Sequence, residues 1–116
     1  MAGTIFQNMI IVRKGDSFDI LIQLKHGEKS FMDLTDCTIK MDVRDDNNLL
    51  FSKEAEIIEA QNGKARIKLS PKETTQKTGN YKTDIQLRLK NGDVHTIFPS
   101  EITQVGVLKI TPEITE

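Results

Sequence analysis

Residues 80–90 alternate strictly between apolar and polar side chains, and this pattern constrains the fold more than any other feature of the chain. One face of the extended segment carries Tyr81, Thr83, Ile85, Leu87 and Leu89. The other face carries Lys82, Asp84, Gln86 and Arg88. Because side chains of a β-strand point alternately to its two faces, the pattern predicts a strand with one buried face.

Similar strand signals recur about every 8 to 12 residues, which is typical of a sandwich or barrel. The expected strands are residues 8–13, 17–25, 37–44, 49–52, 55–60, 64–69, 80–90, 94–98 and 102–111. The count predicts an all-β fold, a two-sheet antiparallel β-sandwich of immunoglobulin-like build with eight or nine short strands. We expect one domain over residues 1–116, with a frayed tail at 112–116.

Turn-forming residues separate these segments. Residues 26–28 and 45–48 are predicted turns, and residues 31–36 form a crossing loop. Asn-Gly pairs at 62–63 and 91–92 each predict a hairpin, because a type I′ turn needs positive φ at both central positions.

Residues 71–76 predict one short helical turn. Ser70 suits the N-cap, Pro71 the first helical position, and Glu73 the third position of a capping box. A helix this short needs packing against the rest of the fold.

Tyr81, with Gly79 before it, and Cys37 have further predicted structural roles. Tyr81 follows Gly79 and a turn, and is placed like a tyrosine corner that fastens a loop to its strand. Cys37 lies in register with inward residues, so we expect a buried free thiol that packs as a small hydrophobe. It is the single cysteine of the chain, which excludes an intrachain disulfide.

The composition excludes several function classes. Sixteen basic and 17 acidic residues give a formal net charge of −1, which argues against a nucleic-acid binder. No apolar run approaches the roughly 20 residues that cross a bilayer, and the start lacks a secretory signal. We therefore expect synthesis in a reducing cytoplasm, with later export inside an assembled particle left open.

No set of residues predicts catalysis. The two histidines and Cys37 lack zinc-site spacing, and the acidic turn near residue 45 fails the calcium-loop pattern. Phosphate loops and nucleophile elbows are absent from the sequence. We expect no enzyme activity, no metal, no cofactor and no small-molecule ligand.

The segment 8–13 is apolar on both faces and is expected to lie at a sheet edge. Such a strand needs cover from the core, a second sheet or a partner subunit. We therefore expect a protein interface at Met9, Ile10, Ile11 and Val12.

Three segments, in this order, resemble a family of small β-sandwich proteins from phages and prophages, the baseplate upper protein N-terminal domains of Gram-positive siphophages. The first two are residues 13–18 (RKGDSF) and 32–39 (MDLTDCTI), the latter with Asp36 where the family has glycine. The third contains Leu69-Ser70-Pro71, Thr74, Gly79-Asn80-Tyr81, Asp84-Ile85-Gln86-Leu87 and Asn91-Gly92, continuing to Thr96.

The resemblance implies a non-enzymatic virion structural protein of the tail or baseplate. Such a protein is made in the cytoplasm of the bacterial host and ends in the virion. Its partners would be other virion proteins and copies of itself, with neither nucleic acid nor membrane as a partner. A host-surface or carbohydrate-binding sandwich module is the alternative, although the sequence has no tryptophan to form a sugar platform.

Overall fold

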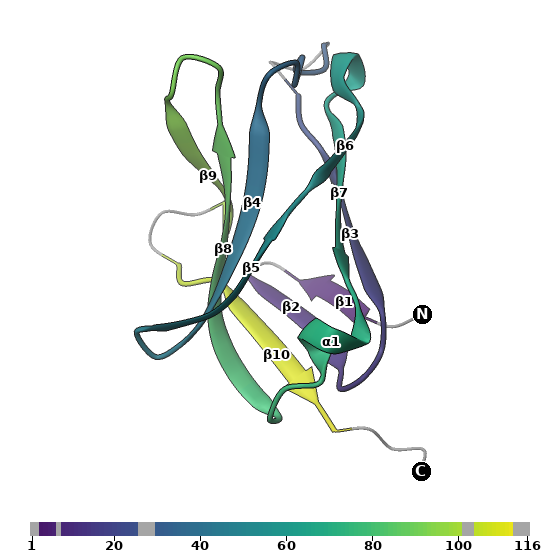
Figure 1. Cartoon of the computed structure of the whole chain (residues 1–116), viewed down its shortest axis with the longest axis vertical. Coiled ribbons are helices and arrows are strands. Elements are labelled where there is room, and N and C mark those ends of the chain that lie inside the picture. Colours follow the sequence, from purple (N-terminus) through teal and green to yellow (C-terminus); the bar gives the residue numbers. More distant parts are fainter. Residues whose placement is uncertain (1–2, 7, 26–29, 101–103, 113–116) are drawn as a thin grey trace.

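The computed structural model of the chain describes residues 3–6, 8–25, 30–100 and 104–112. These residues form ten strands in two sheets that face each other (Figure 1). The all-β two-sheet sandwich predicted from alternation is confirmed. Residues 26–28, predicted as a turn, and the end of the predicted tail lie outside the described residues.

The larger sheet has the strand order β1-β2-β10-β8-β4-β5, and β9 pairs with the second half of β8. All neighbours run antiparallel except β2 and β10, which are parallel. The bounds are β1 (Gly3–Phe6), β2 (Met9–Arg13), β4 (Thr38–Asp45), β5 (Asn48–Glu54), β8 (Gly79–Arg88), β9 (Val94–Phe98) and β10 (Val107–Thr111).

The smaller sheet has the order β3-β7-β6, with β3 (Phe18–Gln23), β7 (Lys64–Leu69) and β6 (Glu56–Glu59). The order of strands within each sheet matches an immunoglobulin-like sandwich. β3-β7-β6 corresponds to strands B-E-D of that fold, and β10-β8-β4-β5 corresponds to strands G-F-C-C′. The first two strands depart from that arrangement, because both join the larger sheet and none pairs with β3.

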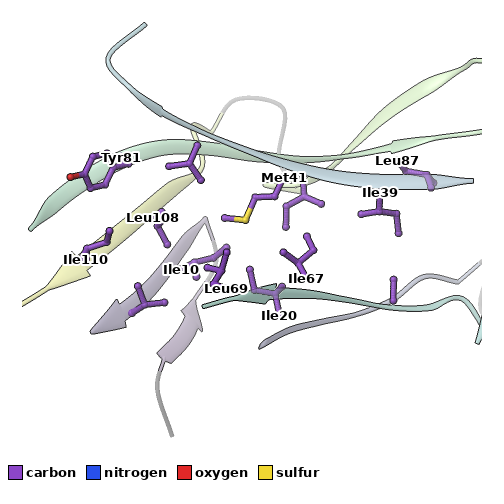
Figure 2. Packing of buried hydrophobic residues seen from close by; sticks show 14 of the residues in the cluster. Ile10, Ile20, Ile39, Met41, Ile67, Leu69, Tyr81, Leu87, Leu108 and Ile110 are labelled. Atoms are coloured by element: carbon purple, nitrogen blue, oxygen red, sulfur yellow. The ribbon is translucent and has the colours of Figure 1, made fainter. Parts of the chain in front are cut away.

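The core lies between the inner faces of the two sheets (Figure 2). Along β8, Tyr81, Thr83, Ile85 and Leu87 are buried while the intervening side chains face outward, as the alternation predicts. Inward side chains of β4, in the same sheet, and of β7, in the opposite sheet, pack with them in one core. The buried apolar side chains are Ile10, Val12, Ile20, Leu34, Ile39, Met41, Val43, Ala65, Ile67, Leu69, Tyr81, Ile85, Leu87, Leu108 and Ile110.

The predicted helical turn is present as α1 (Pro71–Thr74), shorter than the expected 71–76. Ser70 is its N-cap and Pro71 occupies the first helical position. The Glu73 carboxylate accepts hydrogen bonds from the Ser70 N–H at 2.8 Å and the Ser70 hydroxyl at 2.7 Å. Thr74 donates from its hydroxyl to the Asp16 carbonyl at 2.8 Å, which fastens the turn to the segment before β3.

Tyr81 forms the predicted tyrosine corner. Its buried ring lies in the core, and its hydroxyl donates a hydrogen bond to the Lys77 carbonyl four residues earlier. Burial and the nearby Asp45 carboxylate raise the pKa of the hydroxyl, so it stays a donor at neutral pH. Gly79 begins β8 with φ of 144°, a conformation that favours glycine.

Two local expectations are wrong. The predicted eight or nine strands omit β1, because Gly3–Phe6 is too short to show alternation and is held by its pairing with β2. Neither Asn-Gly pair forms a two-residue type I′ turn: in each pair only the glycine has a positive φ, and residues 89–93 separate β8 from β9. The hairpin between β6 and β7 departs further. There a 3-10 turn, η1 (Ala60–Asn62), leads to Gly63 with φ of 66°.

Core packing predicts a large difference between two isoleucine substitutions. Ile67 is fully buried in β7, whereas Ile58 in β6 is 47% exposed. Ile67→Ala is expected to lower the free energy of unfolding by about 2–5 kcal/mol. Ile58→Ala, the matched control, should change it by about 0.5 kcal/mol or less. Urea denaturation midpoints measure both, and equal losses would contradict this position of the core.

Candidate functional site

The predicted interface residues lie in β2, which is an interior strand. β1 pairs with one side of β2 and β10 with the other, so the expectation of an edge at this segment is wrong. The Ile10 and Val12 side chains are 0% and 1% exposed and belong to the core, which leaves them no surface for a partner. Met9 and Ile11 point to the outer side and are half-buried, so the interface prediction stands for these two residues alone.

Met9 and Ile11 belong to a surface that combines apolar and basic side chains. In register, Val107 lies beside Met9 and Lys109 beside Ile11. We call the outer surface formed by Met9, Ile11, Arg13, Val107 and Lys109 the β2–β10 face.

An exposed valine borders this surface. Val105 is 58% exposed, and its carbonyl accepts a hydrogen bond from the Asn8 side-chain amide at 2.8 Å. The Asn8 carbonyl in turn accepts from the Val107 N–H at 2.8 Å. The loop residue is therefore held against the end of β2, and it extends the apolar part of the β2–β10 face.

A cleft of about 400 Å³ that combines polar and apolar lining adjoins this surface, between the outer side of β4 and β8 and the segments that follow β9 and precede β10. Gly106 makes the close approach possible: an added Cβ would lie 2.2 Å from the Thr83 carbonyl oxygen. The Thr83 N–H donates to the Gly106 carbonyl at 2.9 Å. The described lining residues are Asp42, Arg44, Lys82, Thr83, Asp84, Thr96, Pro99, Ser100, Gln104, Val105 and Gly106.

Two carboxylates lie directly opposite each other at the base of the cleft. Asp42 of β4 and Asp84 of β8 are cross-strand partners on the outer face. Like charges in this position repel each other. Burial and, to a smaller extent, the Asp42 charge raise the pKa of Asp84, and Arg44 opposes the shift.

The two carboxylates differ in their partners. Asp42 accepts a hydrogen bond from the Ser52 hydroxyl at 2.6 Å and lies 3.8 Å from the Arg44 guanidinium and 4.0 Å from the Lys40 ammonium. The Asp84 carboxylate forms neither an ion pair nor a hydrogen bond with any described residue. The Asp84 carboxylate is thus free to accept a hydrogen bond or a positive charge from outside the chain.

The sequence could show that Asp42 and Asp84 both face outward, but not that they meet. Outward positions follow from the two-residue period within each strand. Their contact depends on the pairing register of β4 with β8, two strands that are separated by more than thirty residues in the sequence. No local signal encodes that register.

Cys37 is only partly as predicted. It packs against the core, but it is half-buried because it precedes the first paired residue of β4. Its thiol donates a weak hydrogen bond to the Thr35 carbonyl at 3.7 Å. Cys37 is not among the residues that line the cleft.

The chemistry available in the cleft is that of carboxylates, hydroxyls, an amide and two cations. Over the described ranges, no three side chains of His, Cys, Asp or Glu gather closely enough to hold a metal ion. The described part of the chain also contains no helix with the length and apolarity needed to cross a membrane. The cleft can therefore bind polar groups through hydrogen bonds and charge.

No protein-family model matches this sequence, and a search of curated proteins finds no match.

The burial of the Asp84 carboxylate, together with its repulsion by Asp42, predicts a pH-dependent gain of stability in Asp84→Asn. Because the folded-state pKa of Asp84 lies above 3.8, its ionised form weakens folding at neutral pH. At neutral pH the free energy of unfolding of the variant should be about 0.2–1 kcal/mol higher than that of the native chain. The gain should disappear as the pH falls below 3.8, where Asp84 is protonated in both states. Urea denaturation across this range measures it, and a constant difference would contradict the assignment.

Glu73→Gln provides a comparison of opposite sign. Burial raises the pKa of Glu73, but hydrogen bonds from Ser70 and the charge of Lys53 outweigh it and lower the pKa below 4.5. Ionised Glu73 therefore stabilises the fold above pH 4.5, and this contribution is lost as the pH falls. A glutamine oxygen can still accept hydrogen bonds from Ser70, so the variant should lose only the contribution of the charge, about 0.3–1 kcal/mol at neutral pH. The same urea denaturation series measures this loss.

Proposed function

We propose that the chain is a non-enzymatic structural protein of a phage or prophage virion, a component of the tail or baseplate that acts through protein contacts. The observation that carries the proposal is the β2–β10 face, where half-buried Met9 and Ile11 adjoin the exposed side chain of Val105. The resemblance of about residues 13–110 to baseplate proteins supports the same assignment.

The β2–β10 face has the chemistry of a docking surface. Apolar side chains at its centre gain free energy when a partner removes them from water, at about 25 cal/mol per Å² of apolar surface. Arg13 and Lys109 lie at its rim, where charges set the speed and orientation of docking. The matching partner surface is apolar with an acidic rim.

The cleft favours the second candidate, a carbohydrate-binding module. Asp84, Thr96 and Gln104 offer acceptors and donors of the kind that bind sugar hydroxyls. However, the described lining contains no aromatic ring to stack on a sugar.

A glycan array followed by calorimetry tests this second candidate. A saccharide that binds the chain and loses at least tenfold in affinity with Asp84→Asn, in the absence of added metal, would favour it over virion assembly. A blank array would leave the assembly proposal as the better account.

Incorporation into particles tests the proposed function. Particles released after induction of the encoding strain, and purified by density gradient, are expected to contain the chain at a constant ratio to the major tail protein. Quantitative mass spectrometry of the particles measures that ratio. Purified particles without the chain would overturn the proposal.

Ile11→Lys tests whether the β2–β10 face is the surface that contacts other virion proteins. A third cation, placed at the centre of the β2–β10 face, should exclude the chain from particles. The urea midpoint should stay close to that of the native chain, because Ile11 points away from the core. Val94→Lys is the matched control, since Val94 is an exposed β-branched residue of β9. Loss of incorporation in both variants would argue against this surface.

A further inference from the structure

We propose that two copies of this chain pair through the open edge of β3, so that their smaller sheets join into one antiparallel sheet. The pairing deepens the proposed function, since it states how copies would join, but it rests on the geometry of β3 alone. It therefore holds or fails in the purified chain, whether or not the chain is part of a virion.

The backbone of β3 leaves three residues with unpaired groups. The Leu24 N–H donates to the Gly63 carbonyl at 2.9 Å and continues the β3–β7 ladder. In an antiparallel ladder, the residues whose N–H and C=O groups face the partner strand alternate. Phe18, Ile20 and Ile22 therefore bond to β7, whereas the N–H and C=O groups of Asp19, Leu21 and Gln23 point to the open side.

No described strand covers that side. The smaller sheet ends at β3, and the first two strands belong to the other sheet (Figure 1). Among the described residues, no backbone hydrogen bond uses the outward groups of Asp19, Leu21 or Gln23. The Leu21 side chain is 73% exposed, the highest value of any large apolar residue in the described ranges.

The other described edges carry features that discourage strand addition. The pairings of β5, β6 and β9 each contain a register shift, and β5 also contains Lys53. β1 offers four residues. β3 offers six residues in unbroken register with β7, without proline, lysine or a bulge. Apart from the single charge of Asp19, this edge lacks the features with which proteins normally protect an open strand, which favours a partner strand.

The sequence of β3 is complementary to itself in one register. A two-fold axis through Leu21 sets Leu21 against Leu21 of the second copy, and Asp19 against Gln23 on both sides. All three outward residues then form hydrogen-bonded pairs, which gives six backbone hydrogen bonds. No like charges oppose each other, and the axis joins the two exposed leucines. If the axis moves by one residue, Leu21 lies opposite Asp19 or Gln23 of the second copy. Only two hydrogen-bonded pairs of β3 residues then remain instead of three.

The inner face of β3 supports the same partner. Ile67 and Leu69 of β7 are fully buried, whereas Phe18 and Ile22 of β3, on the same face, are half-buried. In the paired sheet, Ile20 lies beside Ile22 of the second copy, and Phe18 lies beside Leu24. The pairing therefore continues the apolar layer across the axis and buries side chains that the single copy leaves partly in water.

Cysteine cross-linking tests the register. In a Cys37→Ala background, Leu21→Cys places two thiols on the axis, where paired Cα atoms lie about 5.5 Å apart, within disulfide range. Asp19→Cys is the matched control, because its two copies lie four residues apart along the strand, about 13 Å. Mild oxidation should produce a covalent dimer from the first variant alone. Failure of the first to cross-link, or equal cross-linking of both, would overturn the pairing.

Two substitutions at Gln23 test the proposed pairing through the equilibrium between monomer and dimer. Gln23→Lys creates two opposite-charge pairs with Asp19 of the second copy, and Gln23→Glu creates two like-charge pairs. Sedimentation equilibrium should show the dimer Kd fall threefold to tenfold with lysine and rise by a similar factor with glutamate, on the order of two cross-strand pair effects. Shifts in the same direction, or a monomer for all forms up to millimolar concentration, would overturn the proposal.

The Gln23 variants also separate pairing from folding. Within one copy, Gln23 lies opposite Lys64 of β7. Glutamate at position 23 gains an opposite charge in Lys64 but loses the hydrogen bond that the Gln23 amide donates to the Asn62 carbonyl at 3.3 Å, so its net effect on the fold is small. It is unfavourable for the dimer, whereas lysine is favourable for the dimer and places a like charge opposite Lys64. Weaker dimerisation of Gln23→Glu with an unchanged or higher urea midpoint cannot result from loss of structure.

Discussion

The register of β8 is the constraint on which most of the structure depends. β8 pairs with β4 along one side and with β10 and then β9 along the other. A slip of one residue would turn its buried face toward water. The same register that sets Met41 beside Ile85 in the core sets Asp42 against Asp84 outside. The repulsion in the cleft is thus a consequence of core packing, and the fold tolerates it because the inner face contributes far more free energy.

Alternation allowed most strands to be predicted, because a buried face imposes a two-residue period on any strand that lies over the core. It could not identify sheet neighbours. Residues 8–13 looked like an edge because Gly3–Phe6 shows no period, and because the parallel partner β10 lies almost a hundred residues away. The apolar character on both sides of β2 has two causes: Ile10 and Val12 face the core, while Met9 and Ile11 lie on the β2–β10 face.

Turn chemistry was predictable in kind but not in geometry. Asn62-Gly63 does mark a reversal, and Gly63 has the positive φ that the pair implied. The turn itself is a 3-10 turn, and the glycine that ends it packs against both the end of β3 and the crossing segment: a Cβ on Gly63 would lie 2.3 Å from the Leu24 carbonyl oxygen and 3.0 Å from the Met32 carbonyl oxygen. By contrast, the capping box at Ser70 and the tyrosine corner at Tyr81 involve residues three or four apart, so the sequence predicted both. Hydrogen bonds between residues close in the sequence could be predicted, whereas contacts between distant segments could not.

The path of the first two strands explains why the two proposed contact surfaces can coexist. In an immunoglobulin-like sandwich a first strand can cover the strand that corresponds to β3. Here β1 and β2 extend the larger sheet instead, which exposes the β3 edge in one layer and creates the β2–β10 face on the outer side of the other. Pairing through β3 uses backbone groups in the plane of the smaller sheet. It leaves Met9 and Ile11 uncovered, because they point outward from the opposite layer. A paired unit would then present two β2–β10 faces related by the two-fold axis, which is the arrangement that lets one small domain link several neighbours.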